Sequence, residues 1–213
     1  MLGDGGATAM WSNVEGLRHK YFVYDEKANV CCGVYVFYSE DSLSKYMASD
    51  LFKMHNPEAM PHFSKVEFEV LDVMPGTELS IEKTAWKNTP PTRDDVIAAK
   101  MLIVDITLDF TTGVEGLPTN SEEFYGFIGT SGYPGMFGGL EGLRGKYFVW
   151  NEKSGHCFGF YTFVSSEGLD KYMSSELFTK QGEPPHIKEL TYSVMDVLPG
   201  TERSLDMGSW SGK

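Results

Sequence analysis

Apolar and polar residues alternate along four segments of the chain, a pattern typical of β-strands that bury one face. The segments span residues 17–24, 31–38, 143–150 and 157–164, and they are rich in aromatic and β-branched residues. A short polar stretch separates the members of each pair, and Asn29 and Gly155 in these stretches suit a turn position with positive φ. The pattern predicts two antiparallel strand pairs.

An amphipathic helix is expected after each strand pair. Ser39 and Ser165 precede acidic residues, as at a helix N-terminus, and apolar residues then recur at helical spacing. These apolar positions are Leu43, Tyr46, Met47 and Leu51 in the first half and Leu169, Tyr172, Met173 and Leu177 in the second. Alternation returns over 65–73 and 189–197, so each half predicts the order strand, strand, helix, strand.

The two halves are also similar in sequence. Residues 14–52 match 140–178 without a gap, with 22 identities in 39 positions. After a two-residue deletion the match resumes with Pro61-His62 on Pro185-His186 and continues with 72–78 on 196–202, and it ends with Trp86 on Trp210. The chain therefore contains two copies of one module.

Further elements are expected upstream of the second copy. Residues 101–110 predict a strand and 121–129 a short helix, which complete the β-α-β-β-α-β order of a ferredoxin-like unit. The first copy begins near Met10, too late to include equivalents. We therefore expect a partial ferredoxin-like module over 10–86, a linker over 87–100 and a complete module over 101–210. Because the first strand of such a unit is central, the first copy needs a swapped element, a neighbouring chain or additional sequence to fill the gap.

The expected fold class is α+β, with tandem ferredoxin-like modules and antiparallel sheets that could close into a barrel or a sandwich. A ferredoxin-like sheet carries helices on one face only, so its other face needs a partner. On strand 101–110 this open face would present Ile103, Asp105, Thr107 and Asp109, and the last strand would add Met195. Strand 31–38 would add one of two alternating sets of side chains, and the pattern does not decide between them. The sets are Cys31, Gly33, Tyr35 and Phe37, or Cys32, Val34, Val36 and Tyr38. Two such sheets closing face to face would enclose space for a small ligand.

Composition narrows the function classes. Lys and Arg number 18 against 30 Asp and Glu, and a net charge of −12 argues against nucleic acid and anionic lipid as partners. No run approaches the roughly 20 apolar residues of a membrane-spanning helix, and the first residues lack the features of a signal peptide. We expect no membrane insertion and a soluble intracellular protein, in the cytoplasm or in an organelle after removal of a transit segment.

Neither a metal nor a cofactor is expected from the motifs. Cys31, Cys32 and Cys157 lack CxxC or paired-histidine spacing, so they are interpreted as reduced structural thiols. The glycine-rich stretch 126–142 lacks the Gly-Lys-Ser/Thr ending of a phosphate loop and is interpreted as a flexible connecting loop. No Ser-His-Asp arrangement, Cys-His arrangement or dinucleotide fingerprint can be assembled from local sequence.

Three groups of residues have both a chemical and a structural interpretation. The loop histidines His62 and His186 could serve as general bases near neutral pH, or could bond to loop backbone. A set of strand aromatics could stack a planar substrate or simply pack in the core; it comprises Tyr21, Tyr35, Tyr147, Tyr161 and Trp150. A set of acids could transfer protons or form a solvated strand face; it comprises Asp105, Asp109, Glu67 and Glu69.

The more complete second copy supplies the predicted site. Tyr147, Tyr161 and His186 are the candidate catalytic residues, and Trp150, Asp105 and Met195 are the candidate ligand-binding residues. Trp86 and Trp210 end the two copies, where an exposed indole is normally avoided, so they are candidate assembly contacts.

One run of the second copy resembles a known family. The run comprises Gly142-Leu143-Arg144-Gly145-Lys146-Tyr147-Phe148, Asn151-Glu152-Lys153-Ser154-Gly155, Gly159-Phe160-Tyr161-Thr162-Phe163, Leu169, Tyr172 and Leu177-Phe178. It resembles the YdhR-like family of monooxygenase-like proteins, in the dimeric α/β-barrel superfamily, over 101–198 as a whole module and 14–74 as a partial one. The resemblance implies ferredoxin-like units that pair sheet to sheet around a cavity, here within one chain where the family pairs two. Barrel relatives include cofactor-free oxygenases of planar aromatic compounds, and the family has no assigned catalytic residues to carry over.

Two functions of different class follow. The first is a cofactor-independent, monooxygenase-like enzyme in which hydroxyl and imidazole groups deprotonate or orient a small aromatic substrate. The second is a non-catalytic protein that self-assembles into a shell or scaffold, because duplicated modules present two nearly equivalent surfaces and an open sheet edge recruits neighbours. We expect a homo-oligomer. Large ordered assemblies would favour the second function, whereas a discrete monomer or dimer that binds aromatic ligands would favour the first.

Overall fold

The computed structural model describes residues 10–11, 13–74, 77, 79–80, 99–130, 136–151 and 153–198. It confirms an α+β fold with antiparallel strand pairing. The chain divides into two compact units. Unit 1 consists of two stretches, Met1–Val70 and Val197–Lys213, and unit 2 consists of the single stretch Leu71–Asp196. The predicted assembly residues Trp86 and Trp210 lie outside the described residues.

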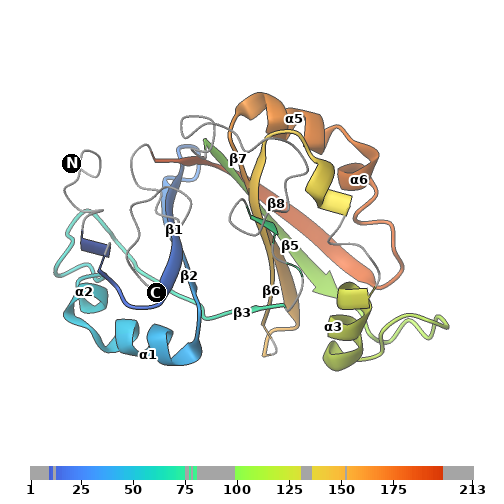
Figure 1. The fold of residues 1–213 in the computed structure, drawn as a ribbon, viewed down its shortest axis with the longest axis horizontal. Coiled ribbons are helices and arrows are strands. Elements are labelled where there is room, and N and C mark those ends of the chain that lie inside the picture. Colours follow the sequence, from blue (N-terminus) through green and yellow to red (C-terminus); the bar gives the residue numbers. More distant parts are fainter. Residues whose placement is uncertain are drawn as a thin grey trace. The chain divides into compact units, whose positions relative to one another are not determined.

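Unit 1 contains the predicted hairpin and helix. Strands β1 (Leu17–Asp25) and β2 (Val30–Phe37) pair antiparallel around a turn in which Asn29 has φ 53° (Figure 1). Helix α1 (Glu40–Ala48) begins where the Ser39 side chain accepts a hydrogen bond from the backbone N–H of Ser42, and the short helix α2 (Asp50–Lys53) follows. These elements enclose a core of Trp11, Leu17, Phe22 and Tyr46.

The packing of unit 1 shows which of the two alternating sets of β2 side chains faces the helices. Tyr35 and Phe37 pack against the Trp11–Tyr46 core, so the set that begins at Cys31 faces the helices. The set that begins at Cys32 lies on the other face, because successive side chains of a strand point to opposite sides.

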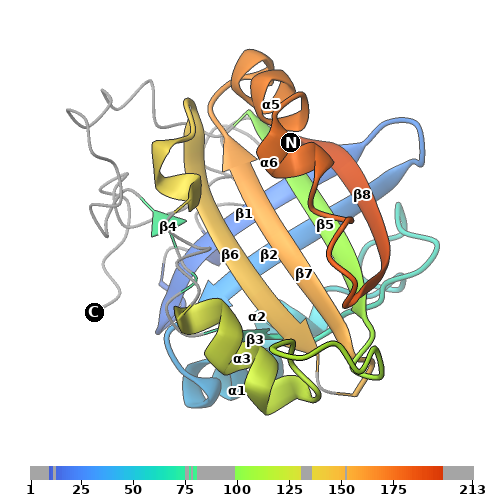
Figure 2. The same cartoon turned by 90° about the vertical axis from the view of Figure 1, so that its right-hand side faces the viewer.

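Unit 2 contains the β-α-β-β-α-β order that the sequence predicted for the second copy. Its strands are β5 (Lys100–Leu108), β6 (Leu143–Asn151), β7 (His156–Phe163) and β8 (Ile187–Val197), paired in the order β8-β5-β7-β6. The helical segments are α3 (Ser121–Thr130), η3 (Phe137–Gly139), α5 (Ser166–Met173) and α6 (Glu176–Thr179). Helices α3, α5 and α6 cover the same face of this sheet (Figure 2). That face holds the larger core, which includes Leu102, Phe148, Phe163 and Tyr172.

The short strands β3 (Asp72–Val73) and β4 (Leu79–Ser80) extend the sheet of unit 2 beyond β6. Between them, the backbone N–H of Met74 donates to Phe148 O at 2.9 Å. In unit 1, the backbone N–H of Leu198 donates to Phe22 O at the same distance. Met74 matches Leu198 and Phe148 matches Phe22 in the alignment of the copies, so the last segment of each copy is bonded to the first hairpin strand of the other copy.

The strand predicted over 65–73 is wrong for most of its length. Only Asp72 and Val73 belong to a strand, and both pair with β6, whereas its counterpart β8 pairs along its length with β5. The described residues of unit 1 contain no counterpart of β5 beside this segment, so it lacks the partner that would make it a strand. Phe68 and Val70 accordingly remain 66% and 50% exposed.

Local structure otherwise recurs at a spacing of 126 residues in the two units. Strands β1 and β2 match β6 and β7, and helix α1 matches α5. Gly33 and Gly159 both lie under the ring of the tyrosine two residues later, and a Cβ at either would be under 3 Å from that ring. A fully buried lysine, Lys20 or Lys146, lies over two aromatic rings in each unit.

Candidate functional site

A cavity of about 420 Å³ lies in unit 2 between the helices and the sheet. Its walls come from α3, β5, β6, β7, α6 and the segment that leads into β8. Most lining side chains are aromatic or aliphatic: Ile106, Leu108, Phe124, Phe127, Ile128, Met136, Phe148, Leu177, Pro184 and Ile187. The volume and the apolar lining are those of a small-molecule site.

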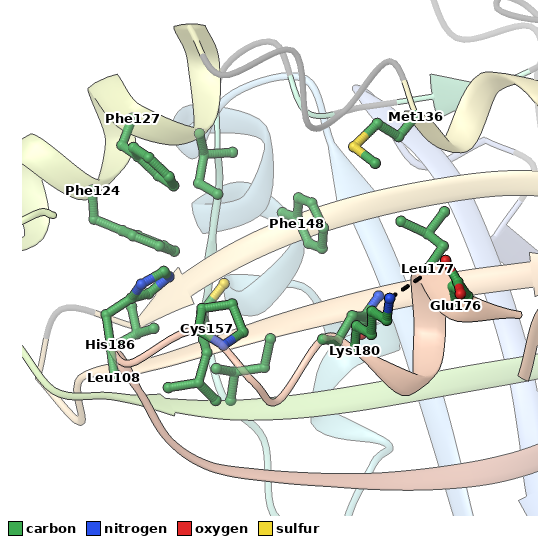
Figure 3. A pocket seen from close by; sticks show the side chains of 15 residues that line it. Leu108, Phe124, Phe127, Met136, Phe148, Cys157, Glu176, Leu177, Lys180 and His186 are labelled. Atoms are coloured by element: carbon green, nitrogen blue, oxygen red, sulfur yellow. Dashed lines mark ion pairs between the residues drawn. The ribbon is translucent and has the colours of Figure 1, made fainter. Parts of the chain in front are cut away.

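The two ends of the cavity differ in character. His186 lies at one end with Phe124 and Phe127, whereas Glu176 of α6 and Lys180, which follows α6, lie at the other, with Phe148 and Cys157 between them (Figure 3). The Glu176–Lys180 ion pair spans 3.5 Å, and both side chains are mostly exposed. A ligand would therefore meet a polar, solvated end and a dry aromatic end.

His186 is held at the dry end by local backbone bonds and aromatic rings. Its carbonyl accepts from the backbone N–H of Asp109, just after β5, which ties the entrance of β8 to the end of its partner strand. The imidazole lies 5.9 Å from the ring of Phe127, edge to face, and 6.4 Å from that of Phe124. Its position follows from a tight turn over Pro184–Ile187, in which the backbone N–H of Ile187 donates to Pro184 O at 2.9 Å and Pro185 occupies the second position.

Burial determines the chemistry of this imidazole. The side chain is 7% exposed, and its Nδ1 atom has no hydrogen-bond partner among the described residues. Burial lowers the pKa of His186, since the charged form loses its hydration. His186 is therefore a neutral imidazole near pH 7, able to accept a proton or a hydrogen bond from a molecule in the cavity.

Gln181 and Cys157 are the other buried groups with heteroatoms in the cavity wall. Gln181 is 7% exposed, and its Nε2 donates to the Tyr172 hydroxyl at 2.6 Å. Burial raises the pKa of Cys157 to about 12, opposed by the nearby Lys146. The sulfur is therefore a neutral thiol near pH 7 rather than a nucleophilic thiolate.

Lys146 lies directly behind the cavity wall. Its Nζ is 3.5 Å from the ring centre of Phe148 and 4.4 Å from that of Phe137, and it donates to Thr77 O at 3.2 Å. The residue has no exposed surface, and this burial lowers the pKa of Lys146 to about 7, despite the opposing influence of Cys157. The amine packs against the ring of Phe148 and joins β6 to the last segment of the first copy.

The structure does not bring the predicted catalytic tyrosines together. Tyr161 belongs to the core under the helices, where it contacts Phe137, Phe148 and Tyr172. It pairs in register with Lys146, and Tyr147 is the next residue along β6, so Tyr147 points to the opposite face of the sheet. Of the three candidate catalytic residues, only His186 lines the cavity.

The predicted ligand-binding residues are similarly dispersed. Asp105 and Met195 lie on the face of the sheet that carries no helices, and Asp105 Oδ1 is 2.8 Å from Nδ1 of His156. Trp150 lies on the helix-covered face, and the centre of its ring is 6.0 Å from the ring centre of Phe124 in the cavity wall. The prediction that the open sheet face forms the ligand site therefore differs from the observed cavity, because the cavity lies under the helices.

Gln181, Phe124 and Lys146 are the relevant residues that the sequence analysis missed. A signal existed for Lys146, since the alternation of β6 puts it on the same face as Phe148 and Trp150, where a lysine must be buried. No comparable signal existed for Gln181, which follows a four-residue helix in an irregular segment. No sequence signal marked Phe124 as a cavity residue, because only packing shows that it borders a void.

Two further searches of the described ranges gave negative results. No group of three or more His, Cys, Asp or Glu side chains is placed to hold a metal ion in that part of the chain. None of the helices described there has the length and apolar character needed to cross a membrane.

Comparisons with known proteins identify the fold. No protein-family model matches the sequence, and no curated protein matches it. Among solved structures, a "putative monooxygenase" from Lactobacillus acidophilus is similar with a TM-score of 0.59 and 12% identity over 93% of this chain and 85% of its own. A "putative monooxygenase" from Fusobacterium nucleatum has a TM-score of 0.59 and 13% identity over 93% and 88%. An "anthrone oxidase-like protein" has a TM-score of 0.52 and 10% identity over 95% and 89%. At these identities the likeness shows a monooxygenase-like α/β fold.

Proposed function

We propose that unit 2 binds a small, flat, mainly apolar molecule and oxygenates it without a cofactor, in a chain built from two copies of a ferredoxin-like module. The observation that carries the proposal is the 420 Å³ apolar cavity with the buried imidazole of His186 in its wall. A buried base in an apolar pocket suits proton abstraction from a weakly acidic aromatic compound. The names of the structural neighbours support the same class of reaction.

The proposed chemistry is the oxidation of an anthrone-type carbon acid by molecular oxygen. The imidazole of His186 accepts a proton from the ring CH₂ group, and the resulting carbanion transfers one electron to O₂. Recombination forms the C–O bond of a peroxide, which the imidazolium protonates. The freed imidazole then takes the second C–H proton, and the C–H electron pair forms the quinone carbonyl as the O–O bond breaks and hydroxide leaves. The imidazolium passes this proton to the hydroxide, so the balance is anthrone plus O₂ to anthraquinone plus water and the protein ends unchanged.

A pair of histidine variants tests this role. We expect His186→Ala to lower the rate of anthraquinone formation by about 10²–10⁴-fold, the usual contribution of a general base. His62→Ala is the matched control, because His62 is the equivalent residue of the first copy and is exposed. O₂ uptake and quinone absorbance would be followed in chelator-treated protein. Equal rates for the His186 variant and the wild type, or a requirement for added flavin or metal, would contradict the proposal.

Self-assembly is a second candidate function, favoured by the extended segment 65–71. This segment belongs to no strand, and it exposes Phe68 and Val70. Exposed apolar residues on an extended backbone are a template for strand addition by another copy. Size-exclusion chromatography with negative-stain microscopy tests it: ordered assemblies that Phe68→Asp disperses would support it, whereas a discrete monomer would refute it.

A further inference from the structure

Strand β2 of unit 1 is paired along one edge only. Among the described residues it pairs with β1 alone, whereas its counterpart β7 lies between β6 and β5. The residues of β7 that lie beside β5 on the helix-covered face recur unchanged in β2. The identical pairs are Cys157 and Cys31, Gly159 and Gly33, Tyr161 and Tyr35, and Phe163 and Phe37. Unit 1 therefore keeps the surface that β5 covers in unit 2, but its described part contains no such strand.

The burial of these matched residues differs in the way that a missing strand requires. All four residues of β7 are buried, whereas Cys31 and Gly33 are exposed and Tyr35 is only half-buried. The residue types are the same in both copies, so the difference in burial reflects what lies beside the strand. Apolar side chains and unpaired backbone groups along a sheet edge favour the addition of another strand.

The other flank of the place that β5 occupies is also present in unit 1. In unit 2, β5 pairs along its second edge with β8, whose Tyr192 lies edge to face with Phe178 of α6 at 5.4 Å between ring centres. Phe68 of segment 65–71 makes the equivalent contact with Phe52 of α2, at 5.2 Å. Segment 65–71 therefore keeps the helix contact of its counterpart, although it belongs to no strand and Phe68 remains 66% exposed.

We propose that the unpaired edge of β2 is a docking site for one β-strand of another protein, antiparallel to β2 and apolar at every second residue. The chemistry of this partner follows from β5, which places Leu102, Val104 and Ile106 opposite the residues of β7 that recur in β2. Main-chain hydrogen bonds along the edge would supply affinity, and the alternate apolar side chains would supply specificity. A second copy of this chain fits less well, because its own β5 is already paired along both edges.

A peptide with the sequence of β5 tests the site. Residues 99–110 would carry a fluorescein label and a polyethylene glycol tail for solubility, and fluorescence anisotropy under reducing conditions would follow binding to the full chain. We expect saturable binding of one peptide per chain. A peptide of the same residues in an order without alternation should bind about tenfold more weakly or worse. Equal binding of the two peptides, or no saturable binding of the first, overturns the proposal.

A matched pair of variants locates the peptide on β2. Cys31→Lys puts a charge on the side that the apolar residues of the peptide would cover, whereas Val30→Lys puts it on the opposite face of the same strand. Both positions are exposed, so both variants should fold, which circular dichroism checks. Cys31→Lys should weaken binding about tenfold or more, since burial of an unpaired charge is costly, and Val30→Lys should change it little. Equal effects of the two substitutions would refute the assignment to β2.

Amide hydrogen exchange separates the proposed partner from other occupants. Bound peptide should slow exchange over 30–37 and 65–71. Slower exchange in unit 2 alone would mean that the peptide replaces β5 there, which contradicts the proposal. A chain that binds no peptide but forms dimers that Cys31→Lys converts to monomers would assign the edge to a second copy instead, and this also contradicts it. None of these measurements depends on turnover, so their failure would leave the proposed function of the cavity untouched.

Discussion

The buried amine of Lys146 should make the free energy of unfolding rise as pH increases above neutrality. In the folded protein burial lowers the pKa of Lys146 to about 7, whereas an unfolded lysine has a pKa of about 10.4. Between these values the unfolded chain holds a proton at this position that the folded chain does not. The free energy of unfolding therefore rises as pH increases above 7, and below pH 7 the contribution is constant because both states are protonated.

The size of the effect follows from the two pKa values. Integrating the difference in bound protons from pH 7 to pH 8.5 gives about 1.2 protons times pH units, or about 1.6 kcal/mol at about 1.36 kcal/mol per unit. Lys146→Met removes the titrating group but keeps a flexible apolar side chain against Phe137 and Phe148. The stability of wild type relative to this variant should therefore increase by about 1.6 kcal/mol over that interval. Other titrating groups are common to both proteins and largely cancel.

Urea unfolding at 25 °C, followed by circular dichroism at pH 7.0 and 8.5, measures this difference. Lys171→Met is the control, because the Lys171 amine is exposed and bridges Glu141 and Glu167, so its removal should leave the pH-dependent gain of the wild type in place. A relative stability of wild type and Lys146→Met that stays constant, or that falls as pH rises, would refute the reasoning from burial.

Three further predictions concern packing, pH and stoichiometry. Gly159→Ala should destabilise the protein by about 2 kcal/mol or more in chemical denaturation, because a Cβ there would lie 2.6 Å from the packed ring of Tyr161. Gly126→Ala is the control: the site is open space within α3, so this variant should be neutral or stabilising by up to about 1 kcal/mol. If both variants behave alike, the close approach is not what Gly159 provides. The oxidation rate should fall as pH drops through the lowered pKa of His186, since only the neutral imidazole accepts a proton, and should persist below the ordinary histidine range; a pH–rate profile with the midpoint above about 6.5 would exclude His186 as the base. Calorimetric titration with 2-naphthol should give one site per chain, because the described part of unit 1 lacks counterparts of α3 and β5; two equivalent sites would show that the cavity does not require them.

Local structure was largely predictable, and the exceptions depend on partners. Asn29 and Gly155 adopt the positive φ expected of hairpin turns, and Ser39 and Ser165 cap helices as expected. These features depend on a few neighbouring residues, so the sequence specifies them directly. The segment 65–73 has the same alternation as β8 but forms a strand only at its last two residues, because a strand also needs a neighbour to bond with.

The residue pattern alone revealed the two similar copies, the order of most of their strands and helices, and the additional elements before the second copy. Which faces are covered became clear only from the packed fold. It showed that Tyr147 and Tyr161 point to opposite sides, that His186 is buried while His62 is exposed, and that Gln181 borders a cavity. The difference arises from the distance along the chain over which each interaction acts. Periodicity and capping act over a few residues, whereas a cavity and the pKa of a buried group depend on atoms from six distant segments and on the water that they exclude.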